Sequence, residues 1–132
     1  MSAATTQFPT ATILAYPRIG RGRELKRALE ARWAGRITEA ELIQAANDLR
    51  KENLARLVEL GLNPADASLA DAPSLYDHVL DATILLGAIP PRFAGREGLD
   101  LYFALARGDD EVGPEEMTKW FDTNYHYLVP EI

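Results

Sequence analysis

Residues 11–26 read ATILAYPRIGRGRELK, and this stretch decides the fold class. Its first six residues, 11–16, form a short apolar and partly β-branched run that Pro17 stops, which predicts a buried strand. The glycine-punctuated turn that follows leads into a predicted helix from about residue 23 to 34, with Leu25 and Leu29 on its inner face. A buried strand followed by a helix is typical of the βα units that build a parallel α/β sheet.

Downstream of this unit the sequence is dominated by helical signals. Thr38 and Glu41 match a capping box, which predicts a second helix ending at Gly61. The other expected elements are a loop at 62–73, a third helix at 74–86 with Ser74 as its N-cap, a short helix at 100–106, a helical turn at 115–120 and a last strand at 125–129. We therefore expect a helix-rich α/β fold. A complete eightfold barrel takes about 250 residues, so the chain is either a small α/β fold or the opening part of a barrel.

The composition limits the classes of function. The chain of 132 residues has a formal net charge of -6, which argues against nonspecific binding of nucleic acid. It contains no cysteine, so disulfides, thiolate metal sites and cysteine nucleophiles are excluded. No stretch approaches the roughly 20 apolar residues of a membrane span, and the polar residues 1–10, a predicted flexible tail, lack the features of a signal peptide. We therefore expect a cytoplasmic protein that binds neither membranes nor nucleic acid.

One segment is basic although the chain as a whole is acidic. Residues 18–36 contain seven basic and two acidic residues, hence a charge of +5, which leaves -11 for the rest. This island indicates either a local anionic ligand or a solvated helix face. A helix N-terminus after a glycine turn favours an anion, and Arg23 and Lys26 lie in the first turns of that helix. The pattern is not a dinucleotide fingerprint, because Leu25 stands where the third glycine would be.

Three further side chains are candidates for a site. His126 lies in the last predicted strand, where it faces a site if it is near the C-terminal end of the strand and is otherwise a satisfied core histidine. His78 is expected to be bonded to a neighbour, and the wide separation of the two histidines argues against a metal site within this chain. Lys119 either reaches an anion or extends to solvent. The acidic pairs at 109–110 and 115–116 are expected to be solvated surface.

Seven short blocks of sequence carry a resemblance to a known family. They are YPRIG at 16–20, RELK at 23–26, WAG at 33–35, YDHVL at 76–80, LGAIPPR at 86–92, EMTKWFDTNYHY at 116–127 and VPE at 129–131. In this order they resemble the start of cobalamin-independent methionine synthase. The blocks span nearly the whole chain, and the sixth is long and unusual.

The resemblance implies a methyl transfer from 5-methyltetrahydropteroyltriglutamate to homocysteine, which gives methionine. It also implies two (β/α)8 barrels, of which the C-terminal one holds a catalytic zinc that makes the homocysteine thiol a thiolate. The present chain would then be a partial barrel, made of the first βα units of the N-terminal barrel, with its domain at 11–132. It would hold no catalytic residue, bind no cofactor itself, and be inactive without its partner, the C-terminal barrel.

In this family the N-terminal barrel lends residues to the glutamate tail of the folate. On the matching positions, the residues implied in tail binding are Arg23, Glu24, Leu25, Lys26 and Lys119. Arginine and lysine suit a string of carboxylates through charge-assisted hydrogen bonds, whereas Glu24 and Leu25 are expected to contribute backbone. Arg18 and His126 are candidates for lining the same site.

The residues also allow two other interpretations. A stand-alone interaction module could have kept the opening segment of the barrel without the chemistry, and its exposed sheet edges would favour self-association. A small α/β domain could instead bind an anion with the turn at 20–26.

Residues 62–73 are rich in alanine, aspartate and proline, so the second strand of a barrel is expected to be missing or irregular there.

Overall fold

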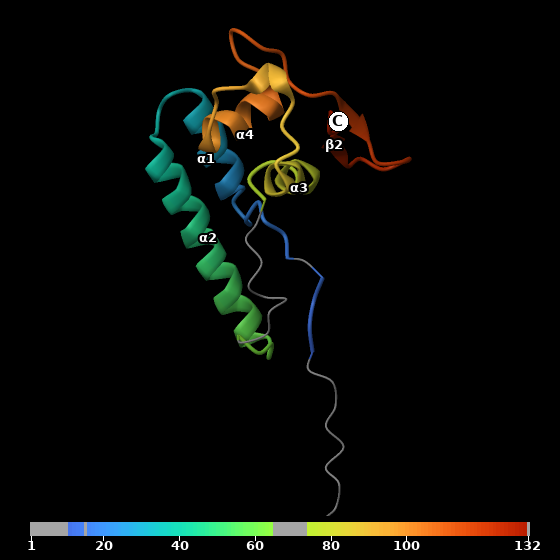
Figure 1. Cartoon of the computed structure of the whole chain (residues 1–132). Coiled ribbons are helices and arrows are strands. Elements are labelled where there is room, and N and C mark those ends of the chain that lie inside the picture. Colours follow the sequence, from blue (N-terminus) through green and yellow to red (C-terminus); the bar gives the residue numbers. More distant parts are fainter. Residues whose placement is uncertain (1–10, 15, 65–73, 132) are drawn as a thin grey trace, which may run out of the picture. The chain divides into compact units, whose positions relative to one another are not determined.

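The computed structural model describes residues 11–14, 16–64 and 74–131 (Figure 1). The chain divides into two compact units, Met1–Pro73 and Ser74–Ile132, called the N-terminal unit and the C-terminal unit below. The predicted tail at 1–10 and most of the predicted loop at 62–73 lie outside the described residues. No helix among those described is long and apolar enough to cross a membrane.

Two helices build the N-terminal unit. α1 (Glu24–Trp33) and α2 (Glu39–Glu59) pack side by side (Figure 1). Their buried residues are all leucines, namely Leu25, Leu29, Leu42, Leu49 and Leu57. The predicted capping box is confirmed, because the Thr38 hydroxyl accepts the N–H of Glu41 at 3.2 Å and the Glu41 carboxylate accepts the N–H of Thr38 at 2.7 Å. The observed bounds of both helices lie within two residues of the predicted ones.

The strand predicted at 11–16 is not formed by the described residues of that segment. Residues 11–14 have no regular backbone pairing, Leu14 is fully exposed, and Tyr16 exposes 37% of its surface. A parallel strand is stable only where neighbouring strands satisfy its backbone N–H and C=O groups. The described part of the chain offers no parallel neighbour. The predicted strand and the expected partial barrel are therefore not seen among the described residues.

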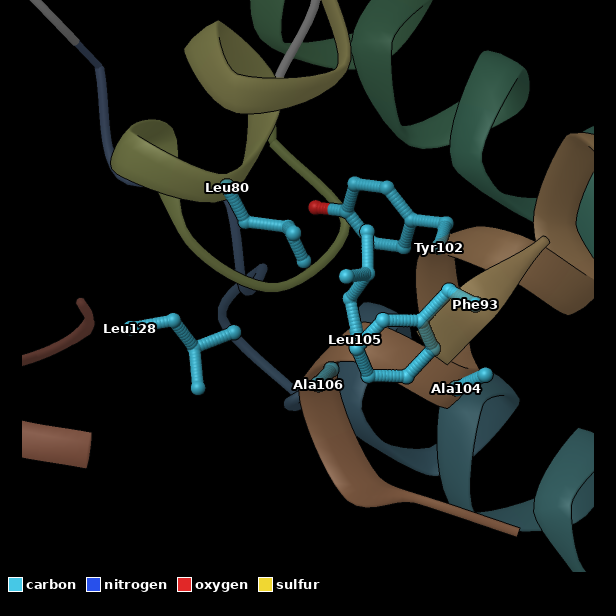
Figure 2. Packing of buried hydrophobic residues seen from close by; sticks show 7 residues of the cluster. All are labelled: Leu80, Phe93, Tyr102, Ala104, Leu105, Ala106 and Leu128. Atoms are coloured by element: carbon cyan, nitrogen blue, oxygen red, sulfur yellow. The ribbon is translucent and has the colours of Figure 1, made fainter. Parts of the chain in front are cut away.

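The C-terminal unit packs its helices around one apolar cluster. The helices are α3 (His78–Leu86), the 3-10 turn η2 (Pro91–Phe93) and α4 (Gly98–Arg107), which contains the short helix predicted at 100–106. Figure 2 shows Leu80 of α3, Phe93 of η2 and Leu105 of α4 in the same cluster, and all three are fully buried.

α3 begins later than predicted, because Asp77 and not Ser74 is its N-cap. The Asp77 carboxylate accepts the N–H of Leu80 at 3.1 Å. Ser74 is buried, and its hydroxyl lies 3.4 Å from the hydroxyl of Tyr102 on α4. Serine and aspartate are both good N-cap residues. The contact with α4 gives Ser74 a different partner, and the local sequence does not reveal that contact.

A two-stranded antiparallel sheet follows α4 along the chain. β1 (Met117–Lys119) pairs with β2 (His126–Leu128), with Lys119 opposite His126. The last strand predicted at 125–129 is confirmed in its centre, whereas the helical turn predicted at 115–120 is wrong. Cross-strand hydrogen bonds to β2 stabilise the extended form of residues 117–119, and such pairing outweighs local helical preference.

Candidate functional site

A tight turn leads into α1. Gly20 has a left-handed backbone with φ of 86°, and its carbonyl accepts the N–H of Arg23 at 3.1 Å. Arg23, the N-cap of α1, is also left-handed, with φ of 60° and ψ of 37°. This conformation costs a residue with a Cβ roughly 1–2 kcal/mol. It bends the chain sharply into the helix, so that Arg23 and Lys26 are exposed while Leu25 is buried.

The carboxylate of Glu24 folds back onto this turn. Both of its oxygens accept the N–H of Gly22 at 3.0 Å. They also lie over Gly20, since a Cβ at that position would come within 1.9 Å of a Glu24 oxygen. Glycine at position 20 therefore makes room for the carboxylate. The turn is a place where the backbone holds a carboxylate, and here that carboxylate belongs to the protein itself.

The other predicted residues of the N-terminal unit lie in the same stretch of chain. Lys26 forms an exposed ion pair with Glu30 at 3.7 Å. Leu25 is 1% exposed and packs in the core of the unit, so its side chain does not face a ligand. Arg18 is partly buried just before the turn. The start of α1 thus presents cations to solvent around a backbone turn that holds a carboxylate.

An open groove of about 760 Å³ lies beside the turn. The segment before α1 contributes Tyr16, Pro17, Gly20, Arg21 and Glu24, and α2 contributes Leu49, Glu52, Asn53, Arg56 and Glu59. The blocks of sequence that carry the family resemblance do not include α2, so its contribution to the groove was not predicted. The spacing of residues 49, 52, 53 and 56 nevertheless places them on one face of the helix. The lining has two arginines and three glutamates, so a polyanion would meet cations here only beside Arg21 and Arg56.

The remaining predicted residues lie together on the hairpin of the C-terminal unit. Lys119 and His126 are cross-strand partners, so their side chains share one face of the hairpin. Both are exposed, which excludes a core role for His126. The His126 Nδ1 lies 3.1 Å from the carbonyl oxygen of Asn124. These two residues and the residues at the start of α1 belong to different units.

A buried carboxylate attaches the hairpin to α3. Asp77 is 3% exposed, and its Oδ1 accepts the hydroxyl of Tyr125 at 2.6 Å. Its Oδ2 accepts the N–H groups of Leu80 and Leu128, each at 3.1 Å. Sequence reasoning missed this residue. The available signal was its place directly before a helix, where aspartate is a common N-cap.

Of the acidic residues expected on the solvated surface, Glu115 is buried, whereas Asp109 is exposed as expected. Glu115 is 3% exposed, and burial raises the pKa of its carboxyl. Asp109 is exposed, but it accepts hydrogen bonds from Arg96 at 2.7 and 3.0 Å, which lowers its pKa to about 2. The His78 Nδ1 lies 3.7 Å from a carboxylate oxygen of Asp81, which is longer than a hydrogen bond, so the expected bond to a neighbour stays a prediction.

The residues present do not fit a zinc site. Zinc in proteins is held mainly by histidine and thiolate ligands, with carboxylates in some sites. Within the described ranges, no group of three or more His, Asp or Glu side chains could hold a metal ion, and the sequence has no cysteine. No step that depends on zinc can therefore be assigned to these residues.

The sequence of the chain is similar to a known protein family and to named proteins of several bacteria. The family model described as "Cobalamin-independent synthase, N-terminal domain" matches residues 10–132. Proteins of Rhodococcus jostii and Mycobacterium tuberculosis are 56% and 55% identical to it over 124 residues, and one of Streptomyces coelicolor is 53% identical over 125. All three are named 5-methyltetrahydropteroyltriglutamate–homocysteine methyltransferase. The alignments cover 92–93% of the chain and 16% of each relative, so the chain spans about a sixth of their length.

Proposed function

Because this chain belongs to the cobalamin-independent synthase family, through the N-terminal domain of that family, we propose that it is part of an enzyme that transfers a methyl group from 5-methyltetrahydropteroyltriglutamate to homocysteine. The observation that carries this proposal is the match over residues 10–132, with 53–56% identity to methyltransferases of that name. The same match favours methyl transfer over a stand-alone interaction or anion-binding module.

The role we assign to the start of α1 is binding of the glutamate tail. Such a tail presents several carboxylates, and the turn before α1 already holds one, that of Glu24, on the N–H of Gly22. Arg23 and Lys26 can donate hydrogen bonds to further carboxylates, each worth about 1.5–3 kcal/mol when little exposed to solvent. The side chain of Leu25 is buried, and its N–H donates to the carbonyl of Ile19 at 3.1 Å, so a backbone contribution of Leu25 to tail binding would require that hydrogen bond to be replaced.

Lys119 is the proposed tail-binding cation of the C-terminal unit. It is exposed, and its partner across the two strands, His126, is a second nitrogen-bearing side chain on the same face. We include His126 as a residue that lines the site because it pairs with Lys119 across the strands, and Arg18 because it lies in the segment just before the turn.

The exposed apolar residues support a place within a larger barrel. Leu14 before α1, Leu85 and Leu86 on α3, and Phe121 in the hairpin are large side chains left in solvent, and exposed apolar patches often mark interaction surfaces. In the proposed enzyme the remainder of a (β/α)8 barrel covers them, and residues 11–16 gain parallel neighbours and become a strand. The proposal also includes a domain at 11–132 that has a C-terminal barrel as its partner. It further includes self-association of the isolated chain and a cytoplasmic location.

No catalytic role is proposed for the described residues. Methyl transfer to sulfur needs a thiolate, which bound zinc supplies by lowering the pKa of the thiol. The residues at the start of α1 and on the hairpin can bind and orient the folate tail but offer no such ligand set. The chain by itself is therefore expected to bind folate without transferring methyl groups.

Calorimetric titration with the triglutamate and monoglutamate forms of 5-methyltetrahydrofolate tests the proposal. We expect the triglutamate to bind about tenfold more tightly, because its extra carboxylates add charge-assisted hydrogen bonds. Lys26→Ala should remove part of that difference. Lys51→Ala is the matched control, because Lys51 forms a similar exposed ion pair with Asp48 at 3.7 Å. Equal and negligible binding of both ligands would refute tail binding.

A further inference from the structure

The short strand β2 is held at both ends by one carboxylate. The Oδ1 of Asp77 accepts the hydroxyl of Tyr125, the residue directly before β2, at 2.6 Å. Its Oδ2 accepts the N–H of Leu128, the last residue of β2, at 3.1 Å. Since β2 has only three residues, these two bonds fix both its position and its direction.

The same carboxylate is fixed in turn by α3. Its Oδ2 accepts the N–H of Leu80, which makes Asp77 the N-cap of the helix. Asp77 is 3% exposed, and burial strengthens each of its hydrogen bonds and makes the loss of one costly. The hairpin is therefore attached to a helix end and not to a loop.

Lys119 lies between the two points of attachment. It pairs with His126, which directly follows Tyr125. Trp120, the next residue after Lys119, donates its N–H to the carbonyl of Tyr125 at 2.9 Å. A shift of Tyr125 or Leu128 relative to α3 would therefore carry β1 and Lys119 with it.

We propose that Asp77 and Tyr125 position Lys119 for recognition of the glutamate tail without contacting the tail themselves. This inference rests on the proposed function, in which Lys119 donates a hydrogen bond to a tail carboxylate. Such a bond weakens steeply when the donor leaves its range of distance and angle. Without Asp77 the hairpin would still be held by the buried side chain of Leu128 and by the hydrogen bond from the N–H of Glu115 to the carbonyl of Leu105. Lys119 would then be held less closely in its binding arrangement, so the attachment to Asp77 increases how strongly the chain distinguishes long tails from short ones.

A double-mutant cycle on the whole chain tests the inference. Tyr125→Phe removes one hydrogen bond to Asp77 and keeps the aromatic ring. Tyr127→Phe is the matched control, because it makes the same change inside β2. We expect Tyr125→Phe to weaken triglutamate binding about fivefold and to leave monoglutamate binding unchanged. In a Lys119→Ala background the same substitution should have no further effect, because the ammonium group that it misplaces is absent.

A second variant and a folding control separate the outcomes. Asp77→Asn should show the same dependence on Lys119, and thermal unfolding of each variant establishes that it is folded at the temperature of the titration. Equal losses in both backgrounds, equal losses for both ligands, or an equal effect of Tyr127→Phe would overturn the positioning role. If Lys119→Ala alone leaves triglutamate binding unchanged, the proposed function of Lys119 fails instead, and the inference that rests on it fails too.

Discussion

Replacing Glu24 by alanine should strengthen binding of a polyglutamate tail. In the structure both oxygens of Glu24 lie 3.0 Å from the N–H of Gly22, so a tail carboxylate can reach that N–H only after Glu24 has left. A hydrogen bond to a charged acceptor contributes about 1.5–3 kcal/mol, and exposure to solvent reduces this to about 1 kcal/mol at the turn. Removing this competitor should therefore raise the affinity about fivefold.

Calorimetric titration with the triglutamate measures this gain, with Glu52→Ala as the control. Glu52 lines the same groove, and its replacement removes the same charge without freeing the N–H of Gly22. We expect a gain of about twofold or less for the control, because exposed charges interact weakly. Glu24 is also an acidic residue in the first turn of α1, so Glu24→Ala should cost about 0.5 kcal/mol of stability while it raises the affinity.

Two results would refute the reasoning on Glu24. Equal gains for Glu24→Ala and Glu52→Ala would show that overall charge, and not occupancy of the turn, limits binding. A loss of affinity in Glu24→Ala would show that the carboxylate helps to hold the ligand, and it would also contradict a purely backbone role for Glu24.

The other predictions concern stability. Phe93→Ala should lower the free energy of unfolding by about 3–5 kcal/mol because the ring is fully buried, whereas Phe121→Ala, at a ring 80% exposed, should change it by less than about 0.5 kcal/mol in the same urea titration. Thr38→Ala should cost about 1 kcal/mol through loss of the capping box, measured as a lower midpoint of thermal unfolding by circular dichroism. The hydrogen bond from Arg96 lowers the pKa of Asp109 from 3.8 to about 2, so this carboxylate stabilises the fold above pH 4 and loses that contribution as the pH falls from about 4 to 2. Asp109→Asn should flatten the acid limb of the stability curve, and an unchanged limb would contradict a stabilising ion pair.

The sequence was sufficient for features that are decided within a few residues. The capping box of Thr38 and Glu41 is complete within four positions, and both of its bonds form. The start of α1 was likewise predictable, because residues 23–26 are adjacent in the sequence and lie within the N-cap and first turn of the helix. Local hydrogen bonds and helical spacing need no knowledge of the rest of the chain.

Features that depend on distant partners could not be predicted in this way. Residues 11–16 have the composition of a strand, but a strand also needs neighbours, and the described chain supplies none. Residues 117–119 are extended because they pair with β2 and not because of their own preference. In the candidate site, the contribution of Arg56 and the attachments of Asp77 likewise depend on packing between elements.

One oxygen of Asp77 accepts two backbone hydrogen bonds, and this affects how the C-terminal unit unfolds locally. Its Oδ2 accepts the N–H groups of Leu80 and Leu128 together, so loss of that oxygen deprives both amides of their acceptor at once. In hydrogen–deuterium exchange these two amides should lose protection in a single event, although they are far apart in sequence. The first turn of α3 and the end of β2 would then share one opening free energy and behave as a single cooperative element.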